Sequence, residues 1–148
     1  MDTREIENKI KEGYILAEMW FETVALEKKI AEDALKEHIK KLKEFDEIIV
    51  IDEEYLEAKE VKDFEKSYSS VVKTKILAKN IYALIFATIV YAPSSVIIIK
   101  PEKFSFDLIT VQTIINTFAD LIHRISKIGG KIIIPLPYQK DLSKQDQQ

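Results

Sequence analysis

Residues 79–100 read KNIYALIFATIVYAPSSVIIIK, and no charged side chain lies between Lys79 and Lys100. An uncharged run of this length meets the length criterion for a membrane-spanning helix. Pro93 fixes its own φ and pushes the preceding residue out of the α region, so a helix ends there. The β-branched run VIII at 96–99 is typical of a central strand buried on both faces. We therefore predict a buried helix over 81–91, a turn and a buried strand rather than a membrane span.

The N-terminal part of the chain predicts a short helix followed by a strand. Residues 2–12 form a charged amphipathic pattern that predicts a short helix, which Gly13 ends. Residues 14–25 alternate at period two and are rich in aromatic and branched side chains, which favours a strand. The alternative is one helix over 2–43, which an internal glycine disfavours. The two faces of the predicted strand would carry Ile15, Ala17, Met19 and Phe21 on one side and Tyr14, Leu16, Glu18, Trp20 and Glu22 on the other.

A helix and a hairpin follow. Residues 26–42 have the helical apolar stripe Ile30, Ala34, Leu35, His38, Ile39 and Leu42. Residues 47–51, EIIVI, predict a buried strand that continues into the acidic stretch 52–61. Residues 67–77 predict its antiparallel partner in a long hairpin. Asn80 is the predicted cap of the helix over 81–91, whose inner face would carry Ile81, Leu84, Ile85, Thr88 and Ile89.

The C-terminal part predicts one more long helix, over 107–128. Ser105 or Asp107 would cap its start, and Gly129 with Gly130 would end it in a left-handed conformation. Its apolar stripe consists of Val111, Ile114, Phe118, Leu121, Ile122 and Ile125. KIII at 131–134 is a candidate edge strand. The polar remainder, 135–148, is expected to be a flexible tail.

The order strand, helix, strand, strand, helix, strand predicts an α+β fold of the ferredoxin-like βαββαβ type, with a four-stranded antiparallel sheet and an additional C-terminal helix. We expect one domain over 1–134, with its core in 14–100. Two helices would cover one face of the sheet. The additional helix would cover the other face or pack against a second subunit.

Composition limits the cellular compartment and the kinds of site that the chain can form. The chain has 148 residues and no cysteine, which excludes disulfides and thiolate metal sites and fits a cytoplasmic location. Lysine and isoleucine are abundant and arginine is rare, as in thermophile proteins, although an AT-rich genome gives the same bias. Residues 1–65 carry a net charge of −9 and residues 66–148 a net charge of +6. This asymmetry fits complementary surfaces within one domain, or a polar surface used for self-association.

Catalytic and metal-binding patterns are weak. His38 and His123 are the only histidines, and no cysteine accompanies them, so no metal and no cofactor is predicted. Ser94 and Ser95 follow a proline in a turn and lack the glycine-flanked elbow of hydrolases. The sequence leaves enzymatic activity open and favours a non-enzymatic role. The candidate ligand-binding residues are Glu18, Trp20 and Tyr68. Glu18 and Glu22 would lie beside Trp20 on one face of the first predicted strand, and a partly buried glutamate in such a position is a functional-site candidate.

Nucleic-acid binding is a further possibility, because the RNA recognition motif has the same strand order. The strands 14–25 and 67–77 correspond to its RNA-binding strands, and they offer Trp20, Tyr14, Tyr68, Lys73 and Lys75. The glycine–aromatic signature of that motif is absent. A pI near 5.5 and the acidic stretch DEEYLEAKE would repel a phosphate backbone. Nucleic acid is therefore a disfavoured partner.

The stretches GYILAEMWFETVA, YAPSSVIIIKPEKF and TVQTIINTFADLIHRI resemble a family of small, uncharacterised archaeal proteins. The resemblance covers most of residues 12–128 and implies no known activity. It therefore assigns no functional residue.

Three functions remain. The first is a non-enzymatic interaction or assembly module that forms a homodimer through a sheet face or the final helix. The second is a small-molecule-binding regulatory domain of the ACT type, which has the same strand order but needs a loop rich in Gly and Asp where this chain has ALEKK at 25–29. The third is an RNA-binding module.

Overall fold

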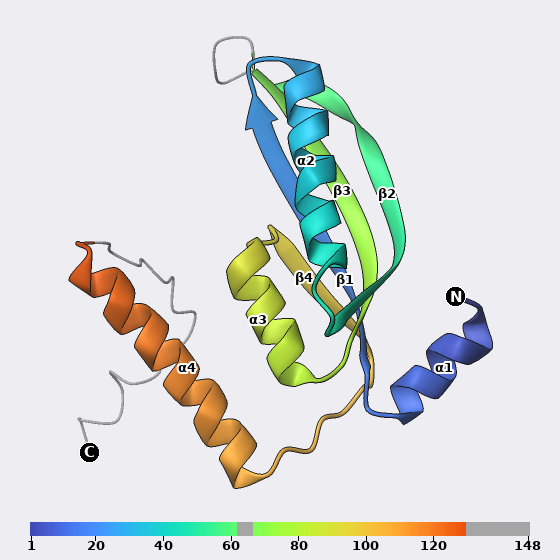
Figure 1. The fold of residues 1–148 in the computed structure, drawn as a ribbon, viewed down its shortest axis with the longest axis vertical. Coiled ribbons are helices and arrows are strands. Elements are labelled where there is room, and N and C mark those ends of the chain that lie inside the picture. The colour runs from blue at the N-terminus through green and yellow to red at the C-terminus, as the bar shows by residue number, and fades with distance from the viewer. Residues whose placement is uncertain (62–66, 130–148) are drawn as a thin grey trace, which may run out of the picture. The chain divides into compact units, whose positions relative to one another are not determined.

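The computed structural model of the protein describes residues 1–61 and 67–129. The chain divides into two compact units, Met1–Phe104 and Ser105–Gln148. The described part of the first unit holds a four-stranded antiparallel sheet and three helices, and that of the second holds one helix (Figure 1). The predicted α+β class is confirmed. The predicted strand at 131–134 and the predicted tail at 135–148 lie outside the described residues.

The element order follows the prediction closely. The strand predicted over 14–25 is present, so the alternative of one long helix over 2–43 is wrong. The acidic stretch 52–61 belongs to the same strand as 48–51, and the hairpin with 67–77 forms as expected. The elements are α1 Thr3–Lys11, β1 Ile15–Ala25, α2 Lys28–Lys43, β2 Ile48–Val61, β3 Ser67–Ala78, α3 Ile81–Tyr91, β4 Ser95–Lys100 and α4 Leu108–Lys127.

Side-chain caps fix the start of three of these helices. Asp2 and Glu5 form a reciprocal capping box at α1. The Asn80 side chain accepts a hydrogen bond from the third backbone N–H of α3, at 2.9 Å. Asp107 rather than Ser105 caps α4, and Gly129 follows that helix at a φ of +78°. The predicted cap Asn80 is correct, and Asp107 is one of the two caps predicted for α4, because caps depend on residues adjacent in sequence.

The sheet order is β2-β3-β1-β4, and each neighbouring pair is antiparallel. β1 and β3 are therefore the central strands, and β2 and β4 are the edges. The prediction that 96–99 forms a central strand buried on both faces is wrong. Ile97 is 48% exposed and Ile98 42% exposed, on opposite faces of the sheet. Four β-branched residues favour an extended backbone, but they do not determine how many neighbours the strand has.

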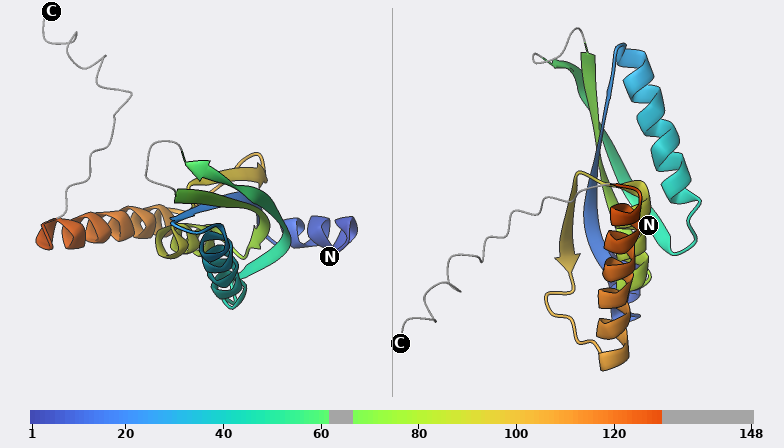
Figure 2. Two further views of the ribbon diagram at one scale, coloured as in Figure 1. Left: turned by 90° about the horizontal axis from the view of Figure 1, so that it is seen from above. Right: turned by 90° about the vertical axis from the view of Figure 1, so that its left-hand side faces the viewer.

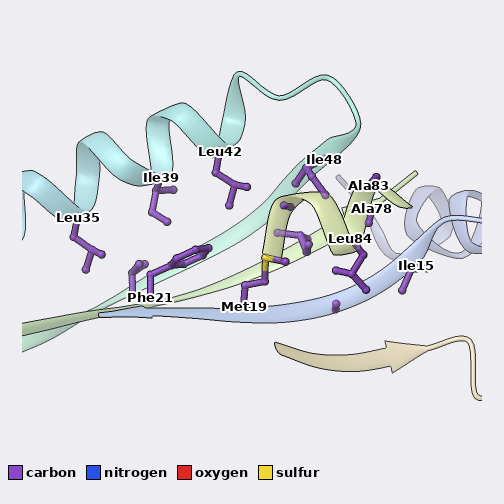
Figure 3. Packing of buried hydrophobic residues seen from close by; sticks show 14 residues of the cluster. Ile15, Met19, Phe21, Leu35, Ile39, Leu42, Ile48, Ala78, Ala83 and Leu84 are labelled. Carbon is purple, nitrogen blue, oxygen red and sulfur yellow. The ribbon is translucent and has the colours of Figure 1, made fainter. Parts of the chain in front are cut away.

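α2 and α3 lie on the same side of the sheet (Figure 2), and the hydrophobic core fills the space beneath them. Figure 3 shows side chains from β1 directed toward those of α2 and α3. The period-two prediction for β1 is correct: its helix-facing residues Ile15, Ala17, Met19 and Phe21 are at most 2% exposed. Met19, Phe21 and Ile76 are among the largest fully buried side chains.

Both helices differ from their predicted stripes. α2 buries Ala31, Leu35, Ile39 and Leu42, whereas Ile30 is 53% exposed and Ala34 is exposed. α3 buries Ala83, Leu84 and Ala87, so Leu84 is the one member of the predicted face among its buried residues. Because α3 is apolar on nearly every side, its sequence pattern does not identify the face that packs on the sheet. The small alanines allow that helix to lie close to the strands.

α4, taken by itself, is an amphipathic helix that buries none of its side chains. Its apolar stripe includes Val111, Ile115, Phe118 and Ile122, each at least 39% exposed. Among the described residues, no helix is long and apolar enough to cross a membrane. In particular, the uncharged run after Lys79 is divided between α3 and β4, as predicted.

Candidate functional site

The sheet face opposite to α2 and α3, which we call the outer face, carries a ladder of alternating charges. Its residues come from three adjacent strands, because the antiparallel register places them side by side. Glu18 on β1 lies opposite Lys75 on β3, and Lys75 lies opposite Asp52 on β2. In the next row, Trp20, Lys73 and Glu54 follow the same order. The ladder therefore consists of Glu18, Trp20, Asp52, Glu54, Lys73 and Lys75.

A diagonal ion pair dominates this ladder. The Lys73 Nζ lies 2.9 Å from the Glu18 Oε2, and the Glu18 side chain is only 16% exposed. The same ammonium lies 5.6 Å from the centre of the Trp20 ring, within the range of a cation–π contact. The hydrogen bond with Glu18 raises the pKa of Lys73. Glu18 is thus committed to a charged partner rather than held as a free general base.

Of the three candidate ligand-binding residues, the structure brings two together. Glu18 and Trp20 share the outer face, as the alternation of β1 requires. Tyr68 pairs with Ala25 at the far end of β3, on the helix-facing side. The three side chains therefore do not line a common pocket. The Trp20 Nε1 is buried and has no hydrogen-bond partner among the described residues.

Ser94 and His38 make contacts that hold neighbouring elements together. The Ser94 backbone N–H and hydroxyl both donate to the Trp20 carbonyl, at 2.8 and 3.0 Å, which ties the turn before β4 to β1. His38 Nε2 lies 2.8 Å from the Tyr91 carbonyl and donates to it, and its ring packs edge-on against Phe21 and Tyr91. Within residues 1–61 and 67–129, no group of three metal-ligating side chains comes together.

A cleft of about 330 Å³ lies where β4 stops short of the end of β1. β1 contributes Phe21, Glu22 and Thr23 to its lining, and the other lining residues come from α2 and from the end of α3. The lining residues are Phe21, Glu22, Thr23, Ala34, Leu35, His38, Tyr91 and Ala92. The sequence prediction missed this cleft, because it depends on the different lengths of two neighbouring strands. The only sequence signal was His38, which shares its helix face with Ala34.

Both edges of the sheet carry exposed apolar side chains. On β4, the exposed residues are Ile97 and Ile98. On β2, Leu56 is 41% exposed, but it stands in an acidic strand. The β4 edge therefore differs from the β2 edge in that the segment from Asn80 to Ile99 has no charge to oppose strand pairing with another chain.

Comparison with known proteins gives one match. The model of the MJ0538 family covers residues 4–146. The chain belongs to the MJ0538 family. The predicted resemblance to a family of small, uncharacterised archaeal proteins is thereby confirmed, and MJ0538 membership carries no known activity to this site. No curated protein and no solved structure matches the chain.

Proposed function

We propose that this member of the MJ0538 family is a non-enzymatic assembly module that forms a homodimer by pairing β4 with β4 of a second copy. The observation that carries the proposal is the exposed apolar edge strand, with Ile97 48% and Ile98 42% exposed. An exposed, apolar edge strand offers unpaired backbone groups to another strand. Soluble proteins normally protect such an edge with charges, prolines or a covering element.

Charge placement supports a two-fold arrangement. With Ile97 on the two-fold axis, the two copies of that side chain are cross-strand neighbours, and Lys100 lies opposite Ser94 of the partner. Like charges therefore do not meet across the new strand pair. The two four-stranded sheets would join into one, and both β4 edges would disappear.

We infer in addition that the first unit has the ferredoxin-like arrangement. The element order from β1 to β4 is βαββαβ, the strand neighbours are β2-β3-β1-β4, and α2 and α3 occupy one face. These features support a split βαβ unit. In that arrangement β4 is an edge strand, which makes dimer formation by strand addition geometrically simple.

RNA binding is the less favoured function. Trp20 lies on a central strand next to Lys73, as a stacking residue would. However, Lys73 is paired with Glu18, and Asp52 and Glu54 lie on the same face. These carboxylates would repel a phosphate backbone.

Light scattering coupled to size-exclusion chromatography, from low to high micromolar protein, tests the dimer. We expect a dimer for the wild type and a monomer for Ile97→Lys, because two lysines would meet at the axis. Leu56→Lys is the matched control, since it places the same charge on the outer face of the other edge strand, and it should remain dimeric. Phe118→Lys tests separately whether the dimer forms through the apolar stripe of α4.

Three results would contradict the proposal. A wild-type protein that is monomeric at high micromolar concentration rules out self-association. If Ile97→Lys and Leu56→Lys weaken the dimer equally, the β4 edge has no special role in it. Dissociation by Phe118→Lys alone moves the interface to α4 and leaves self-association intact.

A further inference from the structure

A second open edge lies on β1, where that strand extends past Ser95, the first residue of β4. The pairing of β1 with β4 ends at Trp20 and Ser95, but β1 runs on to Ala25. Among the described residues, no strand pairs with this part of β1 on the β4 side. Backbone groups alternate between the two sides of a strand, and the Trp20 carbonyl faces β4. The N–H and C=O groups of Glu22 and Val24 therefore point toward the unpaired side.

α2 forms a wall of mixed polarity along this open edge, with Ala34 and Leu35 as its apolar part and His38 as its polar part. Ala34 and His38 line the cleft beside Phe21, and Ile30 precedes Ala34 by one helical turn on the same side of the helix. Ile30 is 53% exposed and Ala34 is exposed, so neither contributes to the core. The end of α3 closes the groove with Tyr91, whose hydroxyl donates to the Lys41 carbonyl at 3.1 Å.

The two faces of the sheet differ at this edge. Phe21 and Thr23 point toward α2, whereas Glu22 points to the outer face, where the Ser69 hydroxyl donates to its carboxylate. A strand added here would therefore place alternate side chains in the cleft, against Phe21 and Ala34, and beside an exposed carboxylate. Glu22 has Val71 as its neighbour on β3, so its other flank is open to a cationic cross-strand partner.

We propose that the open edge of β1 and the adjoining cleft bind an extended peptide strand of another protein, with an apolar side chain in the cleft and a lysine or arginine beside Glu22. The peptide continues the sheet in line with β4. Main-chain hydrogen bonds to Glu22 and Val24 supply affinity, and the cleft supplies specificity. The cleft volume of about 330 Å³ suits one large apolar side chain and its backbone. This site is separate from the β4 edge, so it does not depend on the proposed homodimer.

The test uses the full-length protein and the acetylated, amidated heptapeptide SVKFKVS, followed by amide chemical shifts. We expect saturable shifts centred on Phe21 to Val24 and on Ala34. The charge-reversed peptide SVEFEVS should bind about two- to five-fold more weakly, as expected for a cross-strand charge pair, and Glu22→Lys should reverse the preference. The same lysine peptide with N-methyl groups on alternate amides should not bind, because strand pairing is then blocked.

Variants of α2 provide matched controls. Ala34→Trp fills the cleft and should weaken binding of SVKFKVS by roughly ten-fold or more. Lys36→Trp places the same ring on the exposed side of the same helix and should leave binding within about two-fold of the wild type. The N-methylated peptide keeps the test valid even where Ala34→Trp fails to fold.

Several outcomes would overturn the proposal. The site is ruled out if binding does not saturate at millimolar SVKFKVS. It is also ruled out if Ala34→Trp binds SVKFKVS as tightly as the wild type does, or if the N-methylated peptide binds the wild type as tightly as SVKFKVS does. Equal binding of the lysine and glutamate peptides removes the role of Glu22. If Ala34→Trp instead converts a wild-type dimer into a monomer and the peptide competes with dimer formation, the occupant is a second copy of this chain rather than another protein.

Discussion

Two isoleucines on different strands of the sheet should respond very differently to the same truncation. Ile76 on the central strand β3 is 0% exposed and belongs to the core between the sheet and the helices. Ile97 on β4 is 48% exposed and lies on the outer face opposite Glu18. Ile76→Ala removes a fully buried side chain from close packing, and we expect it to lower the free energy of unfolding by about 4 kcal/mol.

The cost at Ile97 follows from its exposure. Full burial of an isoleucine side chain contributes about 1.5–3 kcal/mol, and about half of this side chain is already in contact with solvent. We expect Ile97→Ala to lower the free energy of unfolding by about 1 kcal/mol. Against a total stability of about 5–15 kcal/mol, only the Ile76 variant approaches global unfolding.

Chemical denaturation followed by far-ultraviolet circular dichroism measures both values. The protein should be dilute, because dimer formation stabilises the folded state by mass action and would add to the cost at Ile97. At high concentration, the wild-type midpoint should rise and that of Ile97→Lys should not. A loss at Ile97 equal to that at Ile76 in dilute solution would refute the edge position of β4 and restore the buried central strand that its composition indicates.

Three further predictions concern local interactions. Burial and the hydrogen bond to Glu53 raise the pKa of the Tyr55 phenol to about 12, so Tyr55 contributes stability below about pH 10 that is lost as the pH rises toward 12. Ultraviolet absorbance should show one phenol titrating near that value, and Glu53→Gln should lower it. A titration step near pH 12 that persists in Tyr55→Phe would contradict this assignment. Asn80→Ala should reduce the free energy of unfolding by about 1 kcal/mol, whereas Asn80→Asp should preserve it, as measured by denaturation. His38→Phe keeps the ring contacts but loses the hydrogen bond to the Tyr91 carbonyl, and we expect a loss of about 1 kcal/mol; an unchanged midpoint would show that water replaces the donor.

The strand β1 shows what local sequence can predict about the candidate sites. Period-two alternation placed Glu18 and Trp20 on one face and Met19 and Phe21 on the other, and both assignments were correct. Tyr68 is a candidate beside Glu18 on the sequence alone, but its face and register depend on the pairing of β1 with β3. That pairing places Tyr68 opposite Ala25, on the other side of the sheet.

The helices show a second limit of sequence patterns. The stripe predicted for α2 was broader than the face that packs, so Ile30 and Ala34 were assigned to the core, although both are exposed and Ala34 lines the cleft beside β1. In α3, every face is apolar, and only the packing of Ala83 and Ala87 against the sheet identifies the inner one. A hydrophobic pattern measures what can be buried, and the neighbouring elements decide what is buried.

Local sequence was enough to predict the kind and order of the elements, including the division of KNIYALIFATIVYAPSSVIIIK into a capped helix, a proline turn and a strand. Such features depend on backbone preferences and caps within a few residues, which the sequence states directly. The position of VIII at an edge, and the part of β1 that extends past Ser95 at the start of β4, depend on the tertiary structure. Strand neighbours and strand ends are fixed by long-range pairing, because the same β-branched residues form an extended backbone whether one strand or two lie beside them.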